Sequence, residues 1–420
     1  MSGRLATAAA WAFVLPALAG YVRVPQGWNL VLPTSQAGLL VLAVLTAVAL
    51  ARGQARLRDL TVVATTGTVL GGLLIAYAAA WPHLRGWAFA EPALHLGTAA
   101  VVYCTFAVLY ARLFYRPEIL ADVFWRATLT AVCLALAAYA AYELGGPGWL
   151  VHRQYGTPRL QGLLSEPSAW APFAPALLLL ALARRRRAWF ALILLATLLT
   201  KSPTVLLAVA GSLAAWYVLR RRTPAGRGAV LGAVLGGGVL AGHWLTGVDI
   251  GRPLSANLAD QFVVRLASGI SAVTSGGTVG RNDRFASTQA VVDELSLRGW
   301  LWTGIGPGSE GYILGATGML PNALPVYVLA SFGVLGVAVL AVLLVRAVLA
   351  ARSQATLGIF LAFVVACTIN SAGGWEGYKF VVVAIVAGVS GVRAPGRRGR
   401  TPSPPLPGAA PDPRTAAGRR

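Results

Sequence analysis

The chain has 420 residues, of which 57% are hydrophobic and only 12% are charged, and its mean hydropathy is +0.67. A soluble domain of this size cannot bury so much apolar surface, so the composition indicates an integral membrane protein. The formal net charge of +21 arises mostly from basic residues in short segments between apolar runs. This is the positive-inside pattern, with added attraction to anionic lipid, and it does not indicate a nucleic-acid partner.

Apolar runs near 20 residues recur along the chain, which is typical of transmembrane helices. Because backbone polar groups in lipid must be paired within the segment, we expect each run to be helical. The sequence therefore predicts an all-α polytopic membrane protein with about 12 spans (11–12). The expected spans are residues 5–23, 34–51, 60–80, 93–114, 127–144, 167–183, 188–200, 203–219, 228–245, 323–349, 355–371 and 379–392.

Two of these segments have alternative interpretations. Residues 1–22 resemble a signal peptide, but an uncleaved first helix is the favoured interpretation in a chain with so many later spans. Residues 188–200 are short and meet the next segment at Lys201-Ser202-Pro203. That pair forms either two full spans or a helical hairpin that does not fully cross.

The distribution of basic residues predicts the orientation. With a cytoplasmic N-terminus, 24 of the 35 Lys and Arg fall on the cytoplasmic side. This places both termini inside and the long polar segment, about 246–322, outside. Arg184–Arg187 and Arg220–Arg222 are then topology anchors rather than ligand sites. We expect an integral membrane domain over 1–392 and a disordered, basic, Pro/Arg-rich cytoplasmic tail over 393–420.

The basic residues expected on the outer side are contrary to the positive-inside rule, under which Lys and Arg are concentrated on the cytoplasmic side. They either snorkel to lipid phosphate and pair with nearby acids, or bind an anionic substrate such as a diphosphate, whose oxygens match the guanidinium fork. The candidate diphosphate-binding residues are Arg159, Lys201, Arg265, Arg281 and Arg284.

Three segments contain most of these candidates. In the first, Arg159 and Glu166 precede the span at 167–183, where Ser165 is the expected N-cap and Pro167 lies in the first turn. In the second, Lys201 is the only charge between two apolar runs. It either caps a helix C-terminus or binds phosphate at the membrane surface.

The third segment begins with Arg281, Asp283 and Arg284 and continues to Gly311. Apolar residues in 283–297 predict an amphipathic helix on the membrane surface. Gly304, Gly306 and Gly308 then predict a turn, whose backbone N–H groups either approach an anion or simply reverse the chain.

These three segments, in this order, resemble the O-antigen ligase and O-antigen polymerase superfamily of bacterial membrane glycosyltransferases. The resemblance covers about residues 155–340. It rests on an R-x-x-G-x-x-x-x-P pattern, a charged residue before Ser in a central turn, a G-x-G-x-G loop ending in Asn, and a Gly-x-x-Gly span start. The matching residues are Arg159, Gly162, Pro167, Lys201, Ser202, Arg284, Gly304, Gly306, Gly308, Asn322, Gly333 and Gly336.

The resemblance implies transfer of a glycan from a polyprenyl-diphosphate-linked donor to an acceptor sugar hydroxyl in cell-surface polysaccharide assembly. It implies a multi-pass protein of the bacterial cytoplasmic membrane whose active site lies on the external face. The partners would be the lipid-linked glycan, membrane lipid and possible other polysaccharide-assembly proteins. No metal or other cofactor is expected, since basic residues can stabilise the diphosphate leaving group.

One position departs from the family. Pro321 stands where the ligases have His, which favours a polymerase or a divergent transferase in which a carboxylate acts as the base. The candidate catalytic carboxylates are Glu310, which is favoured, Asp283 and Glu166. Two other functions remain open: a transporter or flippase for a lipid-linked or anionic solute, and a noncatalytic membrane scaffold.

Overall fold

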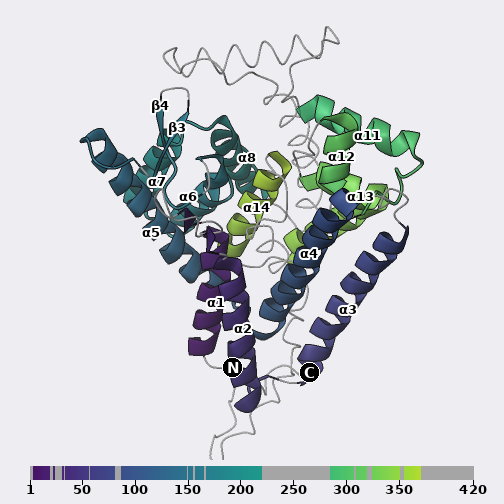
Figure 1. Ribbon diagram of the computed structural model, residues 1–420. Helices are drawn as coiled ribbons and strands as arrows, with labels where there is room; N and C mark the ends of the chain where they lie inside the picture. Colours follow the sequence, from purple (N-terminus) through teal and green to yellow (C-terminus); the bar gives the residue numbers. More distant parts are fainter. Residues whose placement is uncertain are drawn as a thin grey trace, which may run out of the picture.

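The computed structural model describes residues 3–18, 22–23, 31–32, 34–55, 57–80, 87–148, 150–154, 157–164, 167–219, 284–306, 309–318, 324–350 and 354–369. These residues are mostly helical, as Figure 1 shows. The helices before the long polar segment are α1 (Gly3–Leu18), α2 (Thr34–Ala51), α3 (Leu57–Ala80), α4 (Trp87–Leu113), α5 (Pro117–Glu143), α6 (Phe173–Ala183), α7 (Arg187–Leu199) and α8 (Pro203–Leu219). The later ones are α11 (Arg284–Leu297), α12 (Ser309–Thr317), α13 (Leu324–Ala350) and α14 (Gln354–Ile369).

The described strands form two small antiparallel hairpins, which the all-α expectation did not include. One pairs β1 (Val22–Arg23) with β2 (Val31–Leu32), and the other pairs β3 (Val151–Gln154) with β4 (Thr157–Leu160). In the second hairpin Arg159 lies opposite His152. A short 3-10 helix, η1 (Pro167–Trp170), follows it.

Most expected spans coincide with helices, but three differ by six residues or more at their starts. α4 begins at Trp87, six residues before the expected 93. α5 begins at Pro117, ten residues before the expected 127, because proline suits the first helical turn and Glu118 favours the positive helix N-terminus. The expected helix at 167–183 was wrong in its first part. η1 occupies 167–170, and α6 begins at Phe173 with Pro172 at its N-cap and no side-chain cap, whereas Ser165, the expected N-cap, lies outside the described residues. The segments 228–245 and 379–392 lie outside the described residues.

Three described helical segments are long and apolar enough to cross a membrane. They are Arg58–Ala79 in α3, Pro117–Glu143 in α5 and Leu324–Arg346 in α13. Shorter apolar helices include α6, with 11 residues, and α7, with 13. At 1.5 Å per residue, these reach only about 17–20 Å, less than the ~30 Å hydrocarbon core.

The main core surrounds α6 and α14, which pack against each other and against α8. α6 is apolar on all sides and almost wholly buried, as expected for a helix inside a bundle. Phe124, Phe173 and Phe363 make ring contacts at 5.5–6.2 Å and join α5, α6 and α14.

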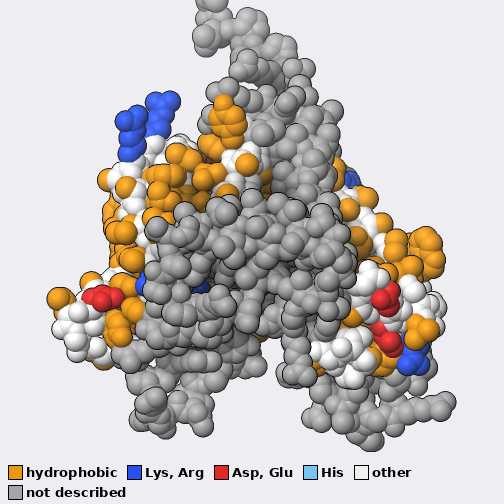
Figure 2. Space-filling model, turned by 90° about the horizontal axis from the view of Figure 1, so that it is seen from above, with side chains coloured by type: hydrophobic (Ala, Val, Ile, Leu, Met, Phe, Trp, Pro, Cys, Tyr) orange, Lys and Arg blue, Asp and Glu red, His pale blue; other side chains and the backbone are white. Residues whose placement is uncertain are grey.

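The outer surface is also apolar. On α3, Val69, Leu73 and Ile75 are exposed, and Figure 2 shows hydrophobic side chains over much of the described part of one face, with few charged ones. Apolar side chains on both the inside and the outside of a helical bundle indicate a lipid-facing surface.

Candidate active site

The first group of candidate residues lies where the β3–β4 hairpin meets the turn between α7 and α8. The half-buried Arg159 guanidinium donates from Nε to the carbonyl oxygen of Thr200 at 3.0 Å. It also donates from Nη2 to the carbonyl oxygen of Lys201 at 3.2 Å. The last carbonyls of a helix have no partner within it, and a cation suits that end. Arg159 therefore caps α7 from a distant part of the chain.

The turn itself is tightly held. Lys201 has a φ of +48°, a left-handed conformation that costs a residue with a Cβ about 1–2 kcal/mol. The Lys201 N–H donates to the carbonyl oxygen of Leu198 at 3.0 Å. The Thr200 hydroxyl donates to the carbonyl oxygen of Thr197 at 2.6 Å and accepts from the Ser202 N–H at 3.3 Å.

Arg159 and Lys201, both predicted from sequence, thus meet at one turn. Two interpretations of Lys201 were open, a helix C-cap or a phosphate ligand. Since the Arg159 guanidinium bonds the carbonyls at this end of α7, the Lys201 ammonium is not needed as the cap. Binding of phosphate by the Lys201 ammonium stays a prediction.

Gly162, three residues after Arg159, lies against α5. It has a φ of +65°, and a Cβ there would lie 2.6 Å from the Cβ of Ala135 on α5. The backbone carbonyl of Gln161 accepts a 2.9 Å hydrogen bond from the Trp170 indole N–H. The Gln161 side chain donates from Nε2 to the carbonyl oxygen of Leu164 at 2.8 Å. The glycine therefore lets the end of β4 lie directly on α5, and this fixes the base of the hairpin.

The second group lies where the glycine-rich turn meets a break inside α13. At Gly333, φ is +65° and ψ is −166°, so α13 is two half-helices. The Ile305 N–H donates to the Ala330 carbonyl and the Gly306 N–H to the Ser331 carbonyl, both at 2.8 Å.

The other side of the break is paired in the reverse direction. The N–H groups of Val334 and Leu335 donate to the carbonyls of Leu301 and Trp302 at 2.9 and 3.4 Å. The 301–306 segment thus pairs backbone groups on both sides of the break, as broken helices in membranes require.

This backbone pairing bears on the two interpretations of the glycine-rich turn. The N–H groups of Gly304 and Gly306 are bonded to protein carbonyls, the former to Trp300 at 2.7 Å. Of the two interpretations left open, an anion site or a simple chain reversal, the bonded N–H groups of these two residues fit the second. Their role is steric: a Cβ on Gly304 would lie 2.4 Å from backbone atoms of Ser331 and Phe332.

Side chains from three elements hold the break in place. The buried hydroxyls of Ser309 on α12 and Ser331 on α13 are hydrogen-bonded at 3.0 Å. The Tyr77 hydroxyl on α3 donates to the Thr303 carbonyl at 2.6 Å, and its ring makes an edge contact with Phe332 at 5.9 Å.

α11 confirms the helix predicted over 283–297, although it begins at Arg284. It packs on α12 and α13 through the buried Val291 and Leu295. Its placement on a membrane surface stays a prediction. Leu297, expected on the apolar face, is 80% exposed.

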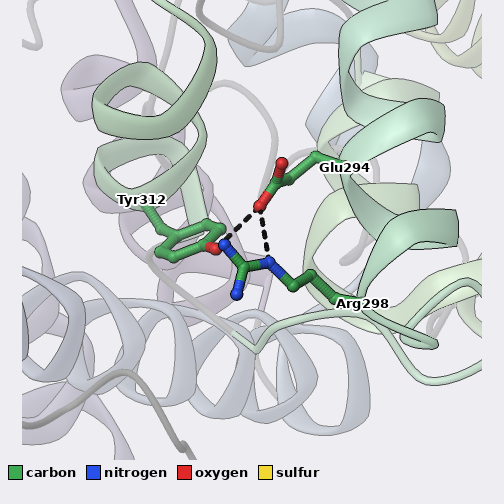
Figure 3. Close-up of polar contacts among 3 residues, drawn as sticks. All are labelled: Glu294, Arg298 and Tyr312. Atoms are coloured by element: carbon green, nitrogen blue, oxygen red, sulfur yellow. Dashed lines mark hydrogen bonds and ion pairs between the residues drawn. The ribbon is translucent and has the colours of Figure 1, made fainter.

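Glu294 joins α11 to α12, as Figure 3 shows. Its Oε1 accepts from the Tyr312 hydroxyl at 2.8 Å and from Arg298 Nε at 3.1 Å. Its side chain is only 12% exposed. Partial burial, then the hydrogen bond to the Glu294 carboxylate and its charge, raise the pKa of Tyr312, while Arg298 opposes them. The sequence did not single out this trio, although Glu294 and Arg298 have the i, i+4 spacing of a helical ion pair.

Other predicted residues are not placed. Glu166, Asp283, Arg265, Arg281, Gly308 and Asn322 lie outside the described residues. Arg284 begins α11 and Glu310 lies in the first turn of α12, but their side chains are also outside the description. Among the described residues, no three His, Cys, Asp or Glu side chains are grouped so as to hold a metal ion.

Comparisons with known proteins assign no function to this site. No family model, no curated protein and no solved structure matches the chain.

Proposed function

We propose that the protein is a membrane glycosyltransferase of the O-antigen polymerase and ligase type. It transfers a glycan from a polyprenyl-diphosphate donor to a sugar hydroxyl on the external face of a bacterial cytoplasmic membrane. The observation behind this proposal is the meeting of Arg159 and Lys201 at a strained turn of an apolar, helical protein. The proposal includes about 12 spans and cytoplasmic termini. In Figure 1 the β3–β4 hairpin and the α11–α12 pair lie toward the same end of the molecule, as one active face requires.

The reaction needs stabilisation of a leaving group. A bond forms between the acceptor oxygen and the anomeric carbon as the bond from that carbon to the phosphate oxygen breaks. The electron pair leaves with the polyprenyl diphosphate, and the acceptor proton passes to a carboxylate. The Lys201 ammonium offers a cation to the departing diphosphate, and Arg159 holds the turn that presents it.

The carboxylate that accepts the proton is Glu310 in this proposal, with Asp283 and Glu166 as the other candidates. Because Pro321 occupies the position of the ligase histidine, successive transfers that lengthen a polymer are favoured over a single ligation. Arg265, Arg281 and Arg284 are the further diphosphate ligands proposed from the sequence. Arg159, whose Nε and Nη2 donate to backbone carbonyls, stays a proposed ligand with them.

A transporter or flippase is the second candidate, and the break in α13 favours it. Interrupted helices are common at the substrate sites of secondary transporters, where free half-helix ends bind the solute. Here the N–H and carbonyl groups at the break are bonded to residues 301–306 instead. The break therefore supports transport less than its shape alone would suggest.

An elongation assay with purified protein tests the proposal. The substrate is lipid-linked oligosaccharide, and products are separated by length. We expect a ladder in the wild type and its loss in Lys201→Gly, because glycine keeps the left-handed turn while removing the side chain that carries the ammonium. Arg298→Gln, which removes a charge from the exposed side of the Glu294 pair, is the matched control and should keep the ladder.

The same variants separate the alternatives. A full ladder in both Lys201→Gly and Arg284→Ala, with normal membrane insertion, would refute the transferase proposal. Movement of lipid-linked sugar across liposomes without elongation would instead support the flippase. A single added unit would indicate a ligase-type transfer.

A further inference from the structure

A pocket lies at the turn between α6 and α7, remote from the groups described above. Half of its lining is apolar and half is basic: Ala181, Leu182, Arg185, Arg186, Arg187 and Phe190. Arg187 begins α7 and Thr200 follows its other end. The pocket is therefore separated from the Lys201 turn by the length of α7, about 20 Å.

The first arginine of the turn has a separate role. Arg184 forms an ion pair with Asp122 on α5, and its guanidinium carbon lies 5.4 Å from the ring centre of Trp125. This ion pair holds the α6–α7 turn against α5, and it neutralises the charge of Asp122.

The next three arginines are in a different position. Arg185, Arg186 and Arg187 are exposed, and within the described ranges they form no ion pair or hydrogen bond through their side chains. Three positive charges thus line one pocket without a described counter-charge.

The local backbone makes this concentration of charge more unfavourable. α7 has Arg186 at its N-cap, no side-chain cap and no acidic residue in its first turn, although a helix N-terminus is itself positive. Arg185 has a φ of +55°, which is rare for a residue with a Cβ. This conformation closes the end of α6, since the N–H groups of Arg185 and Arg186 donate to the carbonyls of Leu182 and Ala181 at 3.1 and 2.9 Å. An anion in the pocket would offset the charge.

We propose that this pocket binds the phosphodiester headgroup of an anionic phospholipid. Arginine forks match phosphate oxygens, and basic pockets between membrane helices suit such headgroups. The apolar half of the lining favours a lipid over free phosphate. Beyond it, the exposed Leu195 and Leu198 continue an apolar surface along α7 for the acyl chains. The inference requires that the protein lie in a membrane, but it does not depend on glycan transfer.

The test measures lipid binding to the full-length protein in a neutral detergent by native mass spectrometry. Phosphatidylglycerol is the probe and phosphatidylcholine is the neutral comparison. We expect Arg185→Gln/Arg186→Gln/Arg187→Gln to weaken phosphatidylglycerol binding on the order of a hundredfold. The matched control removes the same number of charges at Arg220, Arg221 and Arg222, and it should keep the binding within about twofold.

A second variant tests the site even if the triple variant does not fold. In Arg185→Gly, glycine accepts the positive φ, so the protein should unfold at the same or a higher temperature while phosphatidylglycerol binding falls roughly fivefold. Unchanged binding in Arg185→Gly, or an equal loss in the control at Arg220–Arg222, overturns the site. Competition by inorganic phosphate at concentrations equal to the lipid overturns the choice of a lipid.

Discussion

The turn between α7 and α8 and the break inside α13 are two interruptions closed by different chemistry. At the first, the Arg159 side chain reaches the carbonyls of Thr200 and Lys201. At the second, the backbone of 301–306 bonds the backbone on both sides of Gly333. Closure by a side chain keeps the main chains apart, whereas closure by the backbone brings them into contact.

This difference predicts which substitutions each region tolerates. Around Arg159 the relevant quantities are charge and hydrogen bonds, and Lys201 remains available for a ligand. Around Gly333 the relevant quantity is space, because main-chain atoms of Trp302 fill the position of a Cβ. The proposed diphosphate site belongs to the first region, whereas contacts at the second fix α3, α12 and α13 relative to one another.

The largest expected effect is at the break. In Gly333→Ala the new Cβ would lie 2.3 Å from the carbonyl carbon and oxygen of Trp302, and φ is +65°. Neither backbone can yield without losing its hydrogen bonds, so we expect a loss of about 3 kcal/mol or more in the free energy of unfolding. Chemical denaturation in detergent measures it.

Gly315→Ala on α12 is the matched control, since nothing lies within 4 Å of a Cβ there. Alanine is the better helix former, so this variant should be stabilised by up to about 1 kcal/mol. Equal stability of the two variants would show that the break does not require close backbone contact.

The next effect is the loss of the Arg159 cap. Arg159→Ala removes two hydrogen bonds from a charged donor and leaves two carbonyls without it. We expect destabilisation of about 3 kcal/mol by the same measurement. Arg298→Ala, which breaks a half-exposed ion pair, should cost only about 0.5 kcal/mol. Similar losses in the two variants would mean that the Arg159 contacts do not close the turn.

Much of the helical architecture could be predicted because it is encoded locally. Continuous apolar runs gave α2, α7 and α8 to within a residue or two. The junction at Arg159 could be predicted only as a list of candidates. Its contact with Thr200 spans 41 residues and depends on the β3–β4 hairpin.

The two interpretations of the glycine turn could not be separated from the sequence for a specific reason. Glycine permits close approach of an anion and of another backbone equally well, so Gly304 and Gly306 give the same signal for both. The deciding residue is Gly333, which in sequence lies in an apolar run and resembles a helix-packing glycine. Only its unwound backbone identifies the partner of the loop.

A smaller effect tests whether Lys201 takes part in the closure. If Arg159 alone closes the turn, Lys201→Gly relieves the left-handed strain and stabilises the protein by up to about 1 kcal/mol. Lys201→Ala keeps the strain and should leave stability unchanged. A loss above about 1 kcal/mol in Lys201→Ala would show that the side chain does help to close the turn.

The smallest effect concerns pH at the contact between α11 and α12. Because the folded state raises the pKa of Tyr312 above its ordinary value of 10.0, the neutral phenol bound to Glu294 is favoured by folding. Its contribution to stability is therefore fully present below pH 10. It is lost as pH rises from there through the folded-state pKa.

The difference in unfolding free energy between wild type and Tyr312→Phe measures this contribution. At neutral pH it should be about 1 kcal/mol, the value of one hydrogen bond, and it should shrink only in alkaline solution. A matched pair with Glu294→Gln tests the cause, because a neutral amide removes the charge that opposes ionisation of the phenol. The alkaline decline should still begin near pH 10, where the phenol of the unfolded chain ionises, but it should end at lower pH, because the folded-state pKa of Tyr312 is then less raised. If the decline is the same in the Glu294→Gln background, the carboxylate has no part in raising the pKa, and burial of the ring in the α11–α12 contact is the whole cause.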